Sequence, residues 1–221
     1  MDINEFPKEP KSQFFLPGPV GKLEVLTTWP YAVARGVAII CHPHPLYSGT
    51  MNNKVVTTIA KAMEELGLAT VRFNFRGVGK SEGSYGEMRG EIEDLKAVKQ
   101  WVNRMSPDLP VWLAGFSFGS YIAAMVANMS TDVVSLITVA PAVTHANFNQ
   151  LVSIKCPWLI LQGGKDEVVS YDAVREFVGR SPVPVTFITI PDATHFFHGQ
   201  LLELRTAILE GVKNQTSKDS Q

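Results

Sequence analysis

Short apolar runs alternate along the chain with segments in which apolar residues recur every three or four positions. The short runs are typical of buried β-strands, and the spaced pattern is typical of helices with one apolar face. Strands are predicted at 22–28, 36–41, 69–75, 111–114, 134–139, 158–162 and 185–190. Helices are predicted at 55–66, 92–102, 121–127, 171–178 and 201–212. The alternation predicts an α/β fold, with a doubly wound, mostly parallel sheet and helices on both faces.

Both ends of the chain depart from this alternation. Four prolines fall within residues 1–19, which predicts an extended N-terminal arm. Residues 214–221 are polar and are predicted to form a frayed C-terminal tail. A single α/β domain is therefore expected over residues 20–213.

Composition limits the kinds of partner. Charged residues make up 19% of the chain and the net charge is -1, so no basic field is present to hold nucleic acid. The N-terminal residues lack the pattern of a secretion signal, and no apolar run approaches the ~18 residues of a membrane span. We therefore expect a soluble, cytoplasmic protein whose partners are small molecules or other proteins. Cys41 and Cys156 border strand-like runs and are predicted to be buried free thiols, because that compartment is reducing.

A Gly-Phe-Ser-Phe-Gly sequence at 115–119 stands between a predicted strand and a predicted helix. A serine on such a sharp strand-to-helix turn is strained and exposed, as a nucleophile must be. Gly119, Ala123 and Ala127 form a stripe of small residues that lets the helix approach a sheet closely. An ordinary turn that carries a solvated serine does not explain that stripe. Ser117 is therefore the predicted nucleophile.

Candidates for the rest of a catalytic triad follow in the order acid, then histidine, each after a separate predicted strand. Asp166 is the predicted acid, and the adjacent Glu167 is the alternative. His195 is the predicted general base, and His198 is the second candidate. In such a triad the acid accepts the second imidazole N–H, which fixes the tautomer and stabilises the imidazolium.

The segment His42-Pro43-His44-Pro45 follows another predicted strand. In this type of site, that loop donates one backbone N–H to the oxyanion hole and the residue after the nucleophile, Phe118, donates the other. Because proline has no N–H, His44 is the predicted donor. Metal binding by His42 and His44 is the competing interpretation. No third ligand follows at a recognisable interval, so neither a metal nor another cofactor is expected.

Residues 77–81, Gly-Val-Gly-Lys-Ser, resemble the end of a phosphate-binding loop. The first glycine of that motif would fall at Asn74, and turn residues follow Ser81 where the motif requires a helix. Nucleotide binding is therefore not expected, and the segment is interpreted as a structural turn.

Together these motifs resemble the α/β-hydrolase superfamily, and are most similar to the small, lidless bacterial serine hydrolases related to dienelactone hydrolase and short-chain esterases. The resemblance covers about residues 20–212. It implies a triad of Ser117, His195 and Asp166, with His44 and Phe118 as backbone oxyanion donors. Dienelactone hydrolases use a cysteine nucleophile, so the serine at position 117 favours simple ester hydrolysis.

The sequence thus predicts a serine hydrolase that cleaves small carboxylic esters through an acyl-enzyme. Fewer than twenty residues separate the predicted strands that end near Ala140 and begin near Trp158, so little or no lid is expected. A thioesterase, an aminopeptidase-like amide hydrolase and a non-catalytic binding protein on the same fold are the alternatives. Apolar residues near the motifs are predicted to contact the substrate, although each could instead pack in the core. They are Leu46, Tyr47, Phe116, Phe196 and Phe197.

Overall fold

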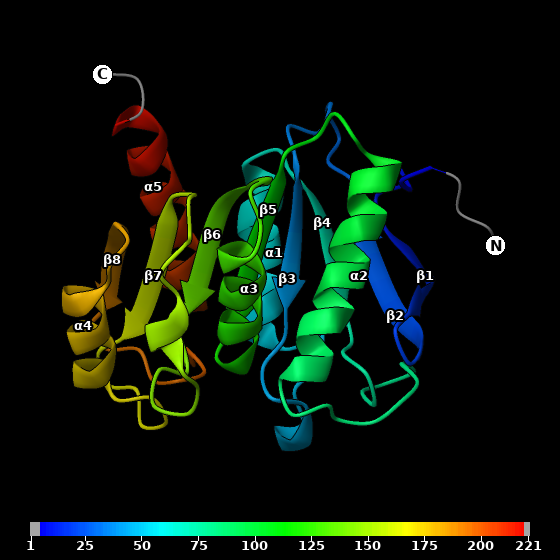
Figure 1. Cartoon of the computed structure of the whole chain (residues 1–221). Coiled ribbons are helices and arrows are strands. Elements are labelled where there is room, and N and C mark those ends of the chain that lie inside the picture. The colour runs from blue at the N-terminus through cyan, green and yellow to red at the C-terminus, as the bar shows by residue number, and fades with distance from the viewer. Residues whose placement is uncertain (1–4, 219–221) are drawn as a thin grey trace.

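The apolar runs form the strands of one eight-stranded sheet in a computed structural model, which describes residues 5–218 (Figure 1). The strands lie in the order β1-β2-β4-β3-β5-β6-β7-β8. Strands β3 to β8 pair in parallel, whereas β1 pairs antiparallel with β2, and β2 with β4. Their bounds are β1 Ser12–Gly18, β2 Gly21–Thr28, β3 Val37–Cys41, β4 Ala69–Phe73, β5 Val111–Phe116, β6 Val133–Val139, β7 Trp158–Gly163 and β8 Val185–Ile190.

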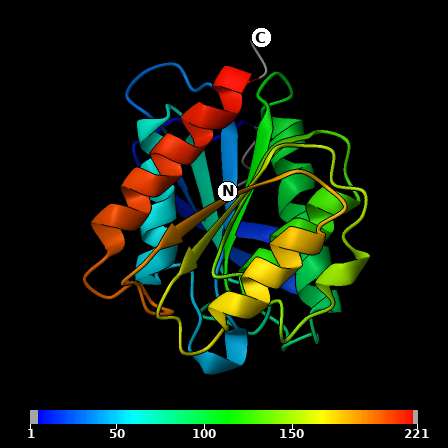
Figure 2. The same cartoon turned by 90° about the vertical axis from the view of Figure 1, so that its left-hand side faces the viewer.

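Helices cover both faces of the sheet (Figure 2). Helices α1 and α5 pack on one face, and α2, α3 and α4 pack on the other. This arrangement confirms the predicted doubly wound α/β fold. The bounds are α1 Lys54–Glu65, α2 Arg89–Met105, α3 Phe118–Asn128, α4 Tyr171–Arg180 and α5 Leu201–Lys218.

The sheet has a hydrophobic core on each side because successive side chains of a strand point to opposite faces. In β3, Ile39 packs on the side of α2 and α3, whereas its neighbour Ile40 packs on the side of α1 and α5. Both side chains are fully buried. Burial of each such side chain contributes about 1.5–3 kcal/mol, so strands that are apolar at every position suit a sheet covered on both faces.

The structure differs from the predicted boundaries at both ends. Residues 12–18 of the predicted arm form the edge strand β1, in which Pro17 is tolerated because an edge strand has only one neighbour. Helix α5 continues to Lys218, so the start of the predicted tail is helical, and Gln215 Nε2 donates to Thr186 Oγ1 at 3.3 Å. The first four residues of the predicted arm and the last three of the predicted tail lie outside the described residues.

The segment that resembled a phosphate-binding loop is a turn tied to the sheet. The buried carboxylate of Glu24 accepts hydrogen bonds from the backbone N–H of Lys80 (2.9 Å) and from Asn74 Nδ2 (2.7 Å). Next to this turn, Arg76 forms a buried ion pair with Asp94, with Nη2 and Oδ1 2.7 Å apart. The backbone amide of Lys80 therefore already has an acceptor within the protein, as the structural interpretation requires.

The connection from β6 to β7, residues 140–157, contains the short 3-10 helix Phe148–Gln150 and no cap. It leaves the carboxyl ends of the parallel strands, at the lower edge of the sheet in Figure 1, without a lid.

Cys41 is buried and Cys156 partly buried, and both are free thiols. Within residues 5–218, no helix has the length and apolar character needed to cross a membrane.

Candidate active site

Ser117 is the one residue between the end of β5 and the start of α3. Its backbone has φ 54° and ψ -117°, in a region that costs a residue with a side chain about 1–3 kcal/mol. The turn is held because the Ser117 N–H donates to the carbonyl oxygen of Val139 at 2.9 Å, which ties it to the end of β6. The side chain is half-buried, and the residue directly follows the carboxyl end of β5. This is the geometry of a nucleophile elbow.

Both glycines of the elbow are needed for close backbone approaches. A Cβ atom on Gly115 would overlap the carbonyl group of Gly119 one turn ahead. A Cβ atom on Gly119 would overlap the carbonyl oxygens of Cys41 and His42 at the end of β3. The spacing of the motif therefore sets how closely α3 packs against the neighbouring strand.

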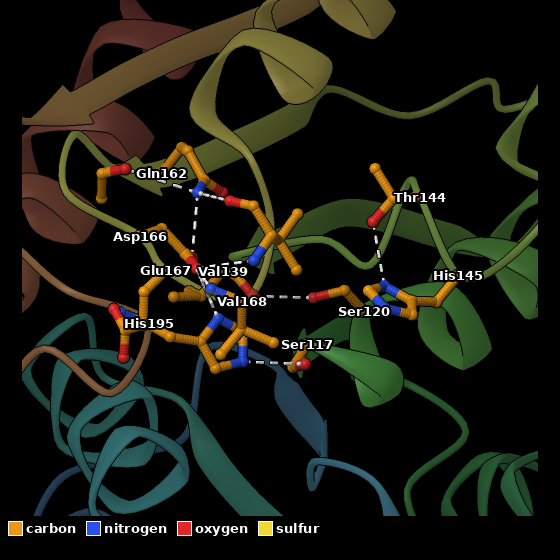
Figure 3. A network of polar contacts seen from close by, with 12 residues as sticks. Ser117, Ser120, Val139, Thr144, His145, Gln162, Asp166, Glu167, Val168 and His195 are labelled. Atoms are coloured by element: carbon orange, nitrogen blue, oxygen red, sulfur yellow. Dashed lines mark hydrogen bonds and ion pairs between the residues drawn. The ribbon is translucent and has the colours of Figure 1, made fainter.

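The structure brings Ser117, His195 and Asp166 together as a hydrogen-bonded chain (Figure 3). The Nε2 atom of His195 lies 3.1 Å from Ser117 Oγ. Its Nδ1 atom lies 2.9 Å from Asp166 Oδ2 and 3.1 Å from Oδ1. The histidine comes from the loop between β8 and α5, and the aspartate from the loop between β7 and α4. In this arrangement, Nδ1 of His195 donates its hydrogen to the Asp166 carboxylate. Nε2 is then free to accept the proton of the Ser117 hydroxyl group.

Asp166 is held as a carboxylate by the loop that carries it. Its Oδ1 atom accepts the backbone N–H groups of Val168 (2.9 Å) and Val169 (2.7 Å), and its Oδ2 atom accepts from Gln162 Nε2 at 3.0 Å. Burial alone would raise the pKa of this carboxyl group. The hydrogen bonds from His195 and from the two amides outweigh burial, so the pKa of Asp166 lies below its usual 3.8.

The two alternative triad members lie elsewhere. The Oε2 atom of Glu167 accepts the backbone N–H of His195 at 3.2 Å, so this carboxylate contacts the backbone of the loop and not the imidazole that faces Ser117. His198 is exposed, and its ring packs near Phe196 with centroids 5.9 Å apart. Neither residue takes part in the hydrogen-bonded chain to Ser117.

The predicted oxyanion donors lie beside Ser117. Phe118 is the first residue of α3, where a backbone N–H has no acceptor within the helix. The rings of His44 and Phe118 are 4.8 Å apart, and both residues line the same cavity as Ser117. The His44 carbonyl accepts the N–H groups of Tyr47 and Gly49, both at 3.1 Å, which closes the loop into a tight turn. Their role as donors remains a prediction.

The buried side chain of His42 holds the loop that carries His44 through hydrogen bonds within the core. Its ring is fully buried, with Nδ1 2.6 Å from the carbonyl oxygen of Pro43, and Nε2 accepts the N–H of Phe75 at 3.1 Å. Burial lowers the pKa of His42 to about 4. Both ring nitrogens are occupied in a neutral imidazole, which does not fit the metal-binding interpretation. Within residues 5–218, no three Cys, His, Asp or Glu side chains gather as a set of metal ligands.

A cavity of about 290 Å³ opens beside Ser117. Its walls come from five connections at the carboxyl edge of the sheet and from the start of α3, so side chains far apart in the sequence meet there. A larger cavity of about 520 Å³ lies at the opposite edge, at the start of β7 and β8, and holds no member of the Ser117 chain. The residues that line the smaller cavity are His44, Tyr47, Met88, Ser117, Phe118, Tyr121, Ala142, His145, Ala146, Val168 and Val169.

Of the five predicted substrate contacts, only Tyr47 lines this cavity. Leu46, its neighbour in the short 3-10 helix Pro45–Tyr47, points to solvent. The prediction is wrong for Phe116 and Phe197, which are fully buried in the core beneath α1 and α5. Phe116 points there because side chains alternate along β5. Phe196 is half-exposed and sets its ring edge-on to His195, with centroids 5.1 Å apart, outside the cavity wall.

Several residues of the wall were missed from the sequence. Val168 and Val169 follow β7, and Ala142, His145 and Ala146 follow β6. A general signal for them exists, since the connections after parallel strands share one edge of the sheet. Tyr121 lies one helical turn beyond Ser117 and faces the same edge. Met88 also follows a parallel strand, but it lies at the far end of the long loop between β4 and α2, where nothing in the sequence singled it out.

An elbow serine, an acid after β7 and a histidine after β8 on this sheet define the α/β-hydrolase class. The family model described as "Serine aminopeptidase, S33" matches residues 34–153, more than half of the chain. An uncharacterized protein of Rickettsia prowazekii is 34% identical over 205 residues, which cover 89% of this chain and 86% of that protein.

Two solved structures are similar over nearly their whole length. An alpha-beta serine hydrolase homologue from Coxiella burnetii is 54% identical, with a TM-score of 0.88, and the match covers 90% of this chain and 96% of that one. XC6422 from Xanthomonas campestris, described as an α/β serine hydrolase without lid, is 41% identical. Its TM-score is 0.90, with 96% of this chain and 97% of that chain covered. The chain therefore belongs to the α/β-hydrolase superfamily and, within it, to the family of the matching model.

Proposed function

We propose that this protein is a serine hydrolase that cleaves small, uncharged carboxylic esters through an acyl-enzyme intermediate. The observation that carries the proposal is the hydrogen-bonded chain from Ser117 through His195 to Asp166 at the wall of a cavity. A strained serine in contact with a histidine that is oriented by a buried carboxylate is the general arrangement of an activated nucleophile.

In the proposed reaction, Ser117 Oγ attacks the ester carbonyl carbon while His195 Nε2 takes the hydroxyl proton. The backbone N–H groups of His44 and Phe118 donate to the oxyanion of the tetrahedral intermediate. His195 then gives its proton to the departing alcohol, which leaves the acyl group on Ser117. A water molecule, deprotonated by the same Nε2 atom, attacks the acyl-enzyme, and His195 returns that proton to Ser117 Oγ as the bond to the acyl group breaks and the acid leaves. Asp166 stays ionised throughout and stabilises the imidazolium.

The lining of the cavity supports an uncharged substrate. Of the described residues that form its wall, none is Asp or Glu, so the free ammonium group of an aminopeptidase substrate would have no carboxylate partner. None is Lys or Arg either, which disfavours a thioester with a phosphate-bearing carrier. Apolar side chains such as Val169 and Ala142 instead suit a short acyl group or a small ring.

A fluorophosphonate probe, which phosphonylates activated serines, tests the nucleophile directly. We expect the wild-type protein to be labelled at Ser117 and Ser117→Ala to remain unlabelled. Turnover of p-nitrophenyl acetate should fall on the order of 10⁶-fold in Ser117→Ala. Ser120→Ala is the matched control, because Ser120 Oγ is buried and donates to the carbonyls of Gly115 (2.8 Å) and Val139 (3.0 Å).

The control should be labelled at the wild-type rate even if it unfolds at a lower temperature. Labelling of Ser117→Ala at that rate would contradict the assignment of the nucleophile. An unlabelled wild-type protein would instead favour a non-catalytic binding protein on the same fold.

A second panel separates the enzyme classes, since the family description names a serine aminopeptidase. We expect p-nitrophenyl acetate to be cleaved with a higher kcat/KM than acetyl-coenzyme A or alanine p-nitroanilide. A higher kcat/KM for the anilide would identify an aminopeptidase and overturn the ester proposal.

A further inference from the structure

Gln162 is in contact with Asp166, the acid of the candidate triad. It lies in the buried strand β7, four residues before Asp166. Its side chain is completely buried. The amide nitrogen lies 3.0 Å from Asp166 Oδ2, 3.1 Å from the carbonyl oxygen of Val169 and 3.4 Å from that of Gly163 (Figure 3). All three neighbours are acceptors, so the NH₂ end of the amide must face them.

The other end of this amide has no comparable use. The Oε1 atom of Gln162 is buried and has no hydrogen-bond partner among the described residues. Leaving a buried polar atom unpaired destabilises a fold, and an apolar side chain would fill the same space in a strand whose neighbours are all buried. Packing therefore gives no reason for glutamine here. The contacts of the amide nitrogen give that reason.

Those contacts act on the Asp166 carboxylate at two points. The amides of Val168 and Val169 hold Oδ1, so Gln162 is the protein donor that holds Oδ2 besides the His195 imidazole. Without it, the carboxylate could turn about the Oδ1 side and move Oδ2 away from Nδ1. The same NH₂ group also binds the carbonyl of Val169, and so fixes the loop whose amides hold Oδ1.

We propose that Gln162 is a positioning residue for the acid-base pair: its buried amide holds the Asp166 carboxylate against the His195 imidazole. The inference rests on the proposed serine hydrolase function and assigns no contact with substrate. Displacement of a reacting group by about 1 Å can lower a rate 10²-fold, so a small movement of the pair should be measurable in kcat.

The first test replaces the amide with an apolar side chain of similar size. In Gln162→Leu we expect kcat for p-nitrophenyl acetate to fall by about 10- to 100-fold while KM changes less than about twofold. The far-downfield proton resonance of the His195 Nδ1–H, which reports on its bond to Asp166, should shift or broaden. Wild-type kcat and an unchanged resonance would overturn the proposal.

The second test makes the donor depend on pH. In Gln162→Glu the new carboxyl group can donate to Asp166 Oδ2 only when protonated, and a neighbouring carboxylate in a buried site raises its pKa. We expect the ratio of variant to wild-type kcat to fall about tenfold between pH 6 and pH 8. A ratio that does not change with pH would contradict a positioning role. If this variant does not fold, Gln162→Leu decides the question alone.

Thr138→Val is the matched control for a structural effect. Thr138 is buried on the neighbouring strand β6, where Oγ1 accepts from Trp158 Nε1 at 2.9 Å, and it does not touch the triad. This variant should unfold at a lower temperature but keep the wild-type kcat, pH profile and Nδ1–H resonance. If Thr138→Val lost as much kcat as Gln162→Leu and shifted the resonance equally, the loss of any buried polar group would have the same effect. That outcome would overturn the positioning role of Gln162.

The rate of Ser117 labelling by a fluorophosphonate separates this inference from the ester proposal. Labelling needs the activated serine but not the natural substrate, so it should slow in Gln162→Leu even if esters prove to be poor substrates. An ester-inactive but labelled wild type overturns only the ester proposal. A wild type that is neither active nor labelled overturns both.

Discussion

A methyl group on Gly119 would lie 2.5 Å from the carbonyl oxygen of Cys41, closer than real Cβ atoms approach another heavy atom. The first turn of α3 and the end of β3 are thus in direct backbone contact. This contact joins the elbow that carries Ser117 to the loop that carries His44. The two predicted oxyanion donors, His44 and Phe118, lie on different chain segments. Their relative position depends on this close backbone contact, which only glycine at position 119 allows.

Gly119→Ala should therefore damage the site more than the fold. Because the added methyl group pushes the elbow away from the loop, we expect kcat for p-nitrophenyl acetate to fall about 10²-fold or more, with a lower Tm. Gly179→Ala in α4 is the control, since a Cβ atom there meets nothing within 4 Å. It should leave kcat unchanged and stabilise the protein by about 0.4–1 kcal/mol. Equal kcat values for the two variants would contradict the prediction.

Asp166→Asn should lower turnover by about 10⁴-fold, because an amide in place of the carboxylate favours the wrong imidazole tautomer. Glu167→Gln should change kcat less than about tenfold, since an amide oxygen can still accept the backbone N–H of His195. Steady-state kinetics on the two purified variants provide the comparison. The reverse ranking would assign the acid to Glu167.

His42 should make stability depend on pH. Its pKa is about 4 in the folded protein against 6.5 when unperturbed, so the unfolded chain binds a proton first as the pH falls. The free energy of unfolding should therefore decrease between pH 6.5 and pH 4, by roughly 3 kcal/mol from this group. His42→Gln cannot titrate and should lose this part of the pH dependence. Urea unfolding of both proteins at pH 7, 6, 5 and 4 measures it, and parallel pH curves would disprove it.

Activity should fall as the acyl chain lengthens. A buried methylene contributes about 0.8 kcal/mol where a groove receives it, but the cavity of about 290 Å³ is small, and the described β6–β7 connection adds no cap to it. We expect kcat/KM to be highest for short p-nitrophenyl esters in a series from acetate to palmitate. A maximum at long chains, or a jump in rate above the micellar concentration, would be incompatible with this cavity.

Filling the cavity should sharpen this preference. Ala146 is half-buried in the wall, so Ala146→Leu should lower kcat/KM for the butyrate ester more than for the acetate ester. Val152→Leu is the control, because Val152 is exposed on the same connection and does not line the cavity. If both variants lower the two rates in equal proportion, the acyl group does not occupy this cavity.

The alternation of apolar patterns was sufficient to predict the sheet and its helices, because strands buried on both faces are apolar at most positions. It was insufficient at β1. Leu16 is buried there, but Phe15 is half-exposed and Pro17 interrupts the segment, so an edge strand looked like an irregular arm. Edge strands pair on one side only, and their sequence therefore carries half of the usual signal.

In the candidate site, local sequence was informative where a turn had to have one shape. Gly115 and Gly119 indicated Ser117, and the order of strands indicated Asp166 and His195. The cavity wall could not be predicted in the same way. Whether Phe116 faces the substrate or the core depends on the register of β5, and the positions of Met88 and His145 depend on loop conformations that only the assembled fold defines.

The bare connection between β6 and β7 has a consequence for how an acyl group on Ser117 would be released. Where a lid closes over a site, it selects which nucleophile reaches the intermediate and often limits the rate of product release. Here the β6–β7 connection only forms one wall of the cavity, so an acyl group on Ser117 would stay open to the surrounding solution. Short alcohols would reach it as readily as water, and the proposed enzyme would then partition between hydrolysis and acyl transfer according to the composition of the medium.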